Sequence, residues 1–316
     1  MSRVISRLKL RQLRLLIAVG QHGSILHAAR EMNLSQPAAT KMIKDLEIDF
    51  DVLLFERTNR GVVPTVFGEA LIRGGQLVFS QIGTTAQEME DLAGGNAGRI
   101  VVGTLLAASG GLLPMAINTV LAQRPRLAIK VVEGTNEVLM PRLRAGELDL
   151  IVGRLPVLRH RSDLEQRRLM QGRIALVVRA GHPLLEIGLL SFDNLRPYGW
   201  ILPPPDTTLR RQIDQFFVAE GQYAPPTLVE SVSYLTNRGL LAASDMICAM
   251  PAEAADLGPA STLAELPLPL PFGDGPLGAS FRSNTSLPPA AAALLDALEQ
   301  AAAILQPISA NDRIGK

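Results

Sequence analysis

The sequence predicts a protein of two parts: an all-α N-terminal module that continues into a long helix, and a larger α/β region. Three observations carry this prediction. Apolar residues recur with a helical period over most of residues 8–92, strand-like and helix-like runs alternate after Arg99, and glycines at 94, 95 and 98 separate the two stretches. With 316 residues, of which 47% are hydrophobic, the chain is long enough for two or three domains with buried cores.

The basic residues are concentrated at the N-terminus. The formal net charge of the whole chain is only +1, but residues 1–44 hold eight cations and one anion, whereas residues 200–316 hold six cations and twelve anions. A basic end on a near-neutral chain indicates either a module that binds a polyanion or a solvated basic face.

Composition excludes several classes of protein. The single cysteine, Cys248, excludes an internal disulfide framework and a multi-cysteine metal site. The N-terminus lacks the pattern of a secretory signal. The uncharged stretch 100–123 is long enough to cross a bilayer, but its glycines and Pro114 favour a strand, a turn and a helix. We therefore expect a cytoplasmic protein without membrane contact.

Residues 8–50 predict three helices arranged as a helix-turn-helix. The first covers 8–20, the second covers 25–32 behind an N-cap at Ser24, and the third covers 36–50 behind an N-cap at Ser35. Pro37 lies in the first turn of the third helix, where its missing N–H costs little. Two helices joined by a turn of three or four residues are typical of DNA-binding proteins, and plain helical packing is the alternative.

The third predicted helix has an apolar face and a polar face. The apolar face can pack on the first two helices and consists of Ala39, Met42, Ile43, Leu46 and Phe50. Side chains near the start of such a helix reach base edges in the major groove. On and beside the polar face we predict DNA contacts from Ser35, Gln36, Pro37, Thr40, Lys41 and Lys44.

Residues 54–65 predict a two-stranded wing around a turn at 59–61. Arg57 and Arg60 would then be placed for phosphate or minor-groove contacts. For Arg57, a salt bridge inside the domain is an equal alternative.

Residues 66–92 predict one long helix. Its apolar residues follow steps near three and four, as in the seam of a coiled coil: Phe67, Leu71, Val78, Ile82, Met89 and Leu92. We expect this helix to pair with its copy from a second chain; packing on its own chain is the alternative.

The region after Arg99 predicts alternating strands and helices. Strands are expected at 99–106, 128–134, 148–153, 173–179, 198–202, 227–232, 246–250 and 277–281, and helices at 111–122, 137–145, 209–221, 234–244 and 288–305. Residues 257–278 are rich in proline and glycine and predict irregular chain with at most one edge strand. The alternation implies right-handed βαβ units and a parallel sheet.

Two stretches carry motifs at specific spacings. The first runs from Gly23–Ser24 through Ala28–Ala29 and 34–38 (LSQPA) to Leu46–Glu47, and the second from 54–57 (LFER) through Arg60–Gly61 to Thr65 and Gly68. In these residues the chain resembles the LysR-type transcriptional regulators, and their order of elements matches nearly the whole chain. The segments 9–16 and 200–210 are similar to regulators of sugar or aromatic-acid catabolism. The chain departs from the family pattern at Phe50–Asp51, where a Leu-Gly pair is common, and at Lys41, where an arginine is common.

The resemblance implies a winged helix-turn-helix at 1–65, a dimerising helix at 66–95 and an effector domain at 96–306 folded like periplasmic binding proteins. The polar residues at 307–316 predict a disordered tail. Lobe I of that domain would comprise about 96–169 and 275–306, and lobe II about 170–274. Ligands in such sheets lie beyond the carboxyl ends of the strands, near helix N-termini. The predicted effector contacts are Thr104, Ser109, Thr135, Asn136, Arg154, Pro203, Asp206, Thr207, Thr208, Ser231, Val232 and Ser233. Helix capping is the alternative for each serine and threonine. For Arg154 we predict pairing with an anionic effector, and a surface position is the alternative.

We therefore expect a homodimer or homotetramer that binds an inverted-repeat operator in double-stranded DNA and responds to a small-molecule effector, with RNA polymerase as a candidate partner. The sequence has no G-x-S-x-G elbow, no P-loop and no G-x-G-x-x-G fingerprint, so neither an enzyme nor a cofactor is expected. The alternative is a solute-binding or enzymatic α/β protein with an accessory helical domain.

Overall fold

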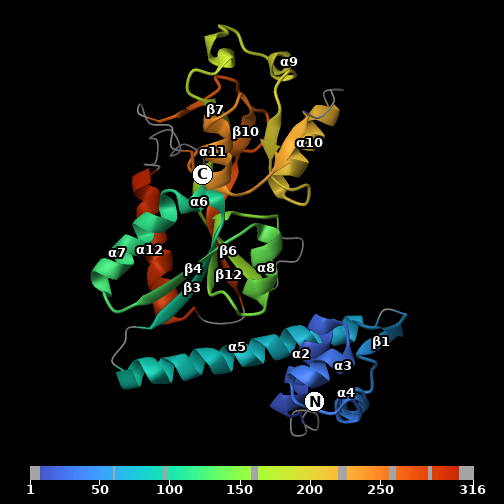
Figure 1. Ribbon diagram of the computed structural model, residues 1–316. Helices are drawn as coiled ribbons and strands as arrows, with labels where there is room; N and C mark the ends of the chain where they lie inside the picture. The colour runs from blue at the N-terminus through green and yellow to red at the C-terminus, as the bar shows by residue number, and fades with distance from the viewer. Residues whose placement is uncertain are drawn as a thin grey trace, which may run out of the picture. The chain divides into compact units, whose positions relative to one another are not determined.

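The computed structural model describes residues 8–59, 61–94, 98–157, 163–219, 226–255, 261–283 and 287–305. By its internal contacts the chain divides into two units, Met1–Met89 and Glu90–Lys316. Each unit is described by itself (Figure 1). The predicted tail and Arg60 lie outside the described residues.

The N-terminal unit begins with the three predicted helices, α2 (Leu10–His22), α3 (Ile25–Glu31) and α4 (Gln36–Phe50). The Oγ of Ser24 accepts a hydrogen bond from the His27 N–H, and that of Ser35 accepts one from the Ala38 N–H, both at 3.4 Å. Their core contains Leu15, Leu16, Val19, Ala28, Ala29, Ala39, Ile43 and Leu46. Thus the apolar face predicted for the third helix is the face that packs.

The chain turns after α4 through a left-handed residue. Asp51 has φ 54°, which the family's glycine would adopt without steric cost. The Asp51 N–H nevertheless bonds to the carbonyl of Ile48 at 3.3 Å, and the Val52 N–H to that of Glu47 at 3.1 Å. The departure from the family pattern therefore leaves the helix end intact.

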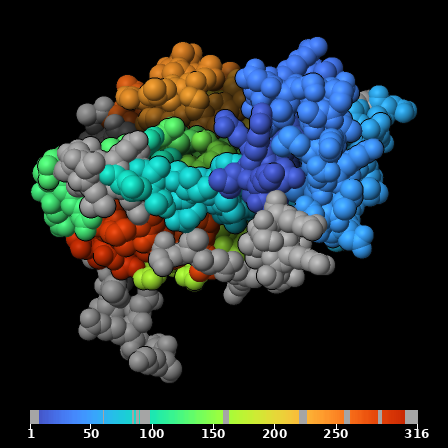
Figure 2. Space-filling model, turned by 90° about the horizontal axis from the view of Figure 1, so that it is seen from below, coloured from blue at the N-terminus to red at the C-terminus, as the bar shows by residue number. Residues whose placement is uncertain are grey.

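A hairpin of β1 (Phe55–Thr58) and β2 (Gly61–Pro64) forms the predicted wing. It stands out from the helices of its unit, in light blue (Figures 1 and 2). The Val62 N–H donates to the carbonyl of Gly23 at 2.9 Å, which ties the wing to the turn after α2. Gly61 has φ 135°, and a Cβ there would lie 2.3 Å from that same carbonyl oxygen, so this position requires glycine. The helix α5 (Val66–Gly94) follows as predicted.

The C-terminal unit contains two five-stranded sheets. The first has the order β4-β3-β5-β12-β6 and consists of β3 (Arg99–Thr104), β4 (Ala128–Glu133), β5 (Leu150–Arg154), β6 (Leu164–Gly172) and β12 (Gly275–Arg282). The helices α6 (Leu106–Ser109), α7 (Leu112–Gln123) and α12 (Pro289–Leu305) pack with this sheet around one core. The helix α8 (Asn136–Arg144) packs with Leu148, Ile151 and Leu164 in a second cluster.

The second sheet has the order β11-β7-β10-β8-β9. Its strands are β7 (Ile174–Arg179), β8 (Trp200–Leu202), β9 (Thr227–Glu230), β10 (Ile247–Pro251) and β11 (Leu263–Glu265). The helices of this lobe are η1 (Pro183–Glu186), α9 (Phe192–Leu195), α10 (Thr208–Ala219) and α11 (Tyr234–Ala242). Trp200 is fully buried in its core with Ile213 and Phe217.

Each sheet is mixed, so the predicted parallel pairing holds only for β3, β4 and β5 in the first sheet and for β8, β9 and β10 in the second. The strand β12 runs antiparallel to β5 and β6, and β7 runs antiparallel to β10 and β11. The strand β6 was missed because its sequence, LEQRRLMQG, is mostly polar and its side chains are largely outside the core. Its pairing extends to Gly172 opposite Gly275, so the first sheet reaches beyond the predicted lobe boundary at 169. Residues 105–106 were predicted as strand, but Leu105 is the N-cap of α6 and Leu106 is its first residue.

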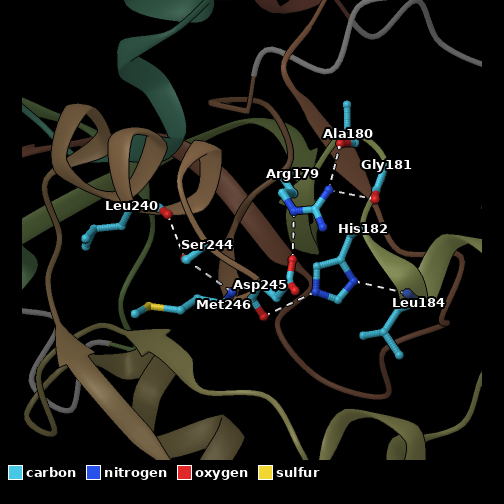
Figure 3. A network of polar contacts seen from close by, with 9 residues as sticks. All are labelled: Arg179, Ala180, Gly181, His182, Leu184, Leu240, Ser244, Asp245 and Met246. Atoms are coloured by element: carbon cyan, nitrogen blue, oxygen red, sulfur yellow. Dashed lines mark hydrogen bonds and ion pairs between the residues drawn. The ribbon is translucent and has the colours of Figure 1, made fainter.

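A network of polar contacts joins β7 to the start of β10 (Figure 3). The Arg179 Nε lies 2.7 Å from the Asp245 carboxylate, and the His182 Nε2 lies 3.2 Å from the Asp245 carbonyl. The buried His182 also accepts a hydrogen bond from the Leu184 N–H at its Nδ1, at 3.1 Å. A backbone N–H points at Nδ1 and a carbonyl oxygen lies at Nε2, so this geometry fits the tautomer that carries its proton on Nε2. This network lies at the opposite end of β10 from the cavity described below, and we interpret it as structural.

Candidate DNA-reading surface and effector cavity

The polar face of α4 is available at the surface of the N-terminal unit. Gln36, Pro37, Lys41 and Lys44 are exposed, as is the capping residue Ser35, and Thr40 is half-buried. The start of α4 also presents backbone N–H groups and the positive end of the helix dipole, which favour contact with phosphate. All six predicted DNA contacts of this region therefore lie on α4 or at its N-cap.

Arg57 lies on β1 and is exposed. Among the described residues it forms no ion pair, so the alternative of a salt bridge inside the domain gains no support. Arg60, its predicted companion, lies outside the described residues.

Two residues of the sequence motif have a positioning role that sequence reasoning missed. The Glu47 Oε1 accepts hydrogen bonds from the N–H groups of Leu54, at 2.9 Å, and Phe55, at 3.4 Å, so it fixes the wing to α4. The Thr65 Oγ1 donates to the Leu53 carbonyl at 2.7 Å and accepts from the Gly68 N–H at 3.1 Å, which caps the start of α5. Both appeared in the motif, but their partners could be named only from the fold.

A cavity of about 530 Å³ lies between the two lobes of the C-terminal unit. This volume is in the range of small-molecule sites. It is bounded by the carboxyl ends of the parallel strands and by the starts of α8, α10 and α11. Of the predicted effector contacts, those that line it are Ser109, Thr135, Asn136, Arg154, Pro203, Thr207, Thr208, Ser231, Val232 and Ser233.

Two predicted effector residues, Thr104 and Asp206, do not line the cavity. The Thr104 side chain is buried at the end of β3, and its hydroxyl donates to the Leu105 carbonyl at 3.3 Å. Asp206 lies in the turn before α10, where its carbonyl accepts from Arg211. Both side chains therefore lie outside the cavity wall in this structure.

Several of the polar residues in the cavity wall cap helices or turns, which was the alternative to ligand binding for the predicted serines and threonines. The Ser233 Oγ accepts from the Thr236 N–H at 3.4 Å, the Thr207 Oγ1 donates to the Pro204 carbonyl at 2.8 Å, and the Ser109 Oγ donates to the Leu106 carbonyl at 3.0 Å. Thr135 differs, because it is the N-cap of α8 and its side chain makes no capping hydrogen bond. Its hydroxyl is thus the better candidate for a ligand contact.

Asn136 and Arg154 form the polar centre of the lobe I wall. The Asn136 Nδ2 donates to the Arg154 carbonyl at 3.1 Å, while its Oδ1 is buried. Arg154 is half-buried, and its Nη2 is also buried. Neither atom has a hydrogen-bond partner in the part of the chain that the structure describes. Burial lowers the pKa of Arg154, and the negative charges of Glu253 and Asp274 oppose that shift. The wall therefore holds unsatisfied donors and acceptors, which a ligand can satisfy.

The rest of the cavity wall is mostly apolar, and sequence reasoning missed it. It includes Leu105, Leu106, Ala107, Ile174, Leu209, Tyr234, Leu235, Ala249, Met250 and Pro251, together with the polar residues Glu133, Glu137 and Asn237. Apolar residues at strand ends carry no signal that separates a cavity wall from a core.

The described part of the chain gives no support for a cysteine nucleophile, a metal site or a membrane-spanning helix. Cys248 is buried, and burial raises its pKa to about 12, so the thiol is protonated at neutral pH and is a poor nucleophile. Among the described residues no group of histidine, cysteine and acidic side chains could hold a metal ion. No helix in these segments is long and apolar enough to span a bilayer.

Comparison with protein families shows to which family a chain with this DNA-reading surface and this cavity belongs. Residues 10–69 match the bacterial regulatory helix-turn-helix proteins of the lysR family. Residues 93–303 match the LysR substrate binding domain. The chain belongs to the LysR family. It is a transcriptional regulator of that family with an effector-binding domain, and the predicted fold class and function are confirmed.

Named relatives agree with this assignment. This LysR-type regulator is 33% identical to the HTH-type transcriptional regulator GbpR of Azospirillum brasilense over 94% of its own length and 87% of the relative. It is 33% identical to the HTH-type transcriptional regulator PcaQ of Agrobacterium fabrum, over 95% of its own length and 96% of the relative. These relatives are named as regulators, which argues against the solute-binding and enzymatic alternatives.

Solved structures share the fold. The crystal structure of CbnR, a LysR family transcriptional regulator, matches with a TM-score of 0.60 and 21% identity, over 93% of this chain and 99% of that one. A full-length OxyR variant from Pseudomonas aeruginosa matches with a TM-score of 0.60 and 25% identity, over 92% and 95% of the two chains.

Proposed function

We propose that this regulator binds an inverted-repeat operator as a homodimer or homotetramer and that a small molecule in the cavity controls its effect on the promoter. In this proposal residues 1–65 bind DNA, residues 66–95 pair with a second copy, and residues 96–306 bind the effector. The site of action is the cytoplasm, where bacterial operator DNA is found, with RNA polymerase as a candidate partner. One observation carries the proposal: a single chain combines an exposed polar helix face with a separate, mostly apolar cavity of about 530 Å³.

Gln36, Thr40 and Lys41 would read base edges, because they lie within the first turns of α4. Ser35, Pro37, Lys44, Arg57 and Arg60 would contact the backbone. Lys41 would act as a point charge and not as the bidentate fork that an arginine offers to guanine. Pairing through α5 is supported by its exposed apolar residues, among them Phe67, Val78 and Ile82. Two half-sites on one dimer would multiply the affinity for the operator.

A thermal-shift screen tests the effector part. We expect a cognate ligand among sugars, sugar acids and aromatic acids to stabilise the full-length protein, because a ligand at ~100 times its dissociation constant adds ~2.7 kcal/mol to the free energy of unfolding. The variant Val232→Trp fills the cavity from its half-exposed rim and should abolish the shift.

The matched control is Leu228→Trp, an exposed position on β9 outside the cavity wall, which should keep the shift. A stabilising ligand that acts equally on both variants binds elsewhere and would contradict the proposed site.

A further inference from the structure

Arg154 occupies an unusual position between the cavity and the crossover segments that join the lobes. It ends β5, and its backbone pairs with Leu277 of β12. It is the one cation among the described residues that line the cavity. The other charged residues in the wall are Glu133, which is exposed, and Glu137, which lies 3.9 Å from Arg211 in an ion pair.

The guanidinium of Arg154 lies against the segment by which the chain returns to lobe I. A Cβ placed on Gly275, the first residue of β12, would lie 2.8 Å from the Arg154 Nη1. Arg154 interacts electrostatically with Asp274, which precedes β12, and with Glu253, which follows β10 in lobe II. Among the described residues neither carboxylate is close enough to form an ion pair with it.

Glu253 is only half-satisfied. Its Oε1 accepts a hydrogen bond from the Arg173 N–H at 2.7 Å, at the other crossover, whereas its Oε2 is buried and has no hydrogen-bond partner among the described residues. The Nη2 of Arg154 is likewise buried, and no described residue offers it a hydrogen bond. A buried charged group that lacks a hydrogen bond destabilises the protein. Any rearrangement that supplies this hydrogen bond therefore stabilises both groups.

We propose that Arg154 selects an effector with a carboxylate group, and that Glu253 competes with this carboxylate for the Arg154 guanidinium. The inference rests on the proposed function, because it takes the cavity as the effector site. The ligand carboxylate would draw the guanidinium toward the cavity, and without a ligand a shift of the lobes could bring Glu253 to it instead.

The surrounding groups fit one class of ligand, a small carboxylic acid with an apolar body. A guanidinium binds a carboxylate through two parallel hydrogen bonds. The hydroxyl of Thr135, which makes no capping hydrogen bond, and the start of α8 lie in the same wall and also favour an anion. The apolar residues Leu105, Leu209 and Met250 suit the body of such a ligand better than a neutral sugar.

The test compares acids with their neutral counterparts. Isothermal titration of the full-length protein would use a library of cavity-sized pairs such as benzoate with benzamide and gluconate with glucose. We expect acids with an apolar body to bind and their neutral counterparts to bind far more weakly. Arg154→Gln should weaken binding of the acid roughly ten- to hundredfold, because a charge-assisted hydrogen bond is lost. Arg154→Lys should fall between, because it keeps the charge without the fork.

Glu253→Gln gives the opposite sign, which a damaged fold would not. Removing the competing carboxylate should tighten binding of the acid several-fold, and this gain should vanish in the Arg154→Gln background. The matched controls are Arg167→Gln and Glu299→Gln, which make the same charge changes in an ion pair between β6 and α12, outside the cavity wall. Both should bind the acid as the unaltered protein does.

The outcomes separate the two proposals. Amides that bind as well as acids, or Arg154→Gln with unchanged affinity, would overturn the role of Arg154 and leave the effector site standing. Absence of an effect in Glu253→Gln would overturn the competition. If the Val232→Trp variant binds every acid of the library as tightly as the unaltered protein does, the effector site itself is wrong.

Discussion

Replacing both Gln36 and Thr40 by alanine is expected to abolish protection of the operator in a DNase I footprint while the protein remains dimeric. The two side chains lie one turn apart at the start of α4, and their loss removes base contacts worth about 1–3 kcal/mol each. In a dimer each loss occurs twice, so the operator would be bound no better than other DNA. The helix itself should persist, because the cap at Ser35 and the buried Ala39, Ile43 and Leu46 are untouched and alanine favours helix.

Gln123→Ala is the control for this variant. Gln123 is exposed at the end of α7 in the other unit, so its change should leave the footprint as it was. An unchanged footprint for the Gln36 and Thr40 variant would contradict the assignment of base reading to α4.

Ile82→Glu is expected to convert the protein from a dimer to a monomer. The Ile82 side chain is 46% exposed on α5, and in the predicted seam it would lie beside its own copy. Burial of the exposed part of this side chain contributes about 1 kcal/mol, and symmetry doubles that loss. Two facing carboxylates add repulsion, so the dissociation constant of the dimer should rise by at least roughly a hundredfold. Sedimentation velocity over a range of protein concentrations measures this change.

Gly83→Glu is the matched control, because it adds the same charge at the next residue. Its position is rotated by about 100° around the helix, away from the seam, and no atom lies within 4 Å of a Cβ placed there. It should therefore remain dimeric. A dimeric Ile82→Glu protein would show that α5 packs on its own chain or that the copies pair elsewhere.

Local patterns predicted the N-terminal unit because its structure is decided by neighbours in sequence. The caps at Ser24 and Ser35, the left-handed Asn33 and the apolar steps of α4 all act within a few residues. The same holds for the turn of the wing.

The sheets of the C-terminal unit depend on pairings between distant residues. Nothing near Leu164 indicates that β6 pairs with Arg282 and its neighbours in β12, and this pairing makes the sheet mixed. The edge position of β6 also removes the apolar alternation by which a strand is recognised.

The candidate site was predictable only in part, because some of its features depend on local sequence and others on contacts between distant residues. Polar residues at strand ends could be named from the general geometry of α/β sheets, and most of them line the cavity. The relation of Arg154 to Glu253 could not be predicted, because those residues are far apart in sequence and belong to different lobes.

A footprint of the full-length protein on its operator, with and without its stabilising ligand, tests most directly whether the cavity controls the DNA-binding units. At a fixed protein concentration and saturating ligand, the extent or pattern of protection should change, since a ligand with different affinity for two arrangements shifts their populations. The change should be lost in Val232→Trp and kept in Leu228→Trp. A footprint that is identical with and without a ligand proven to occupy the cavity would contradict the proposed coupling.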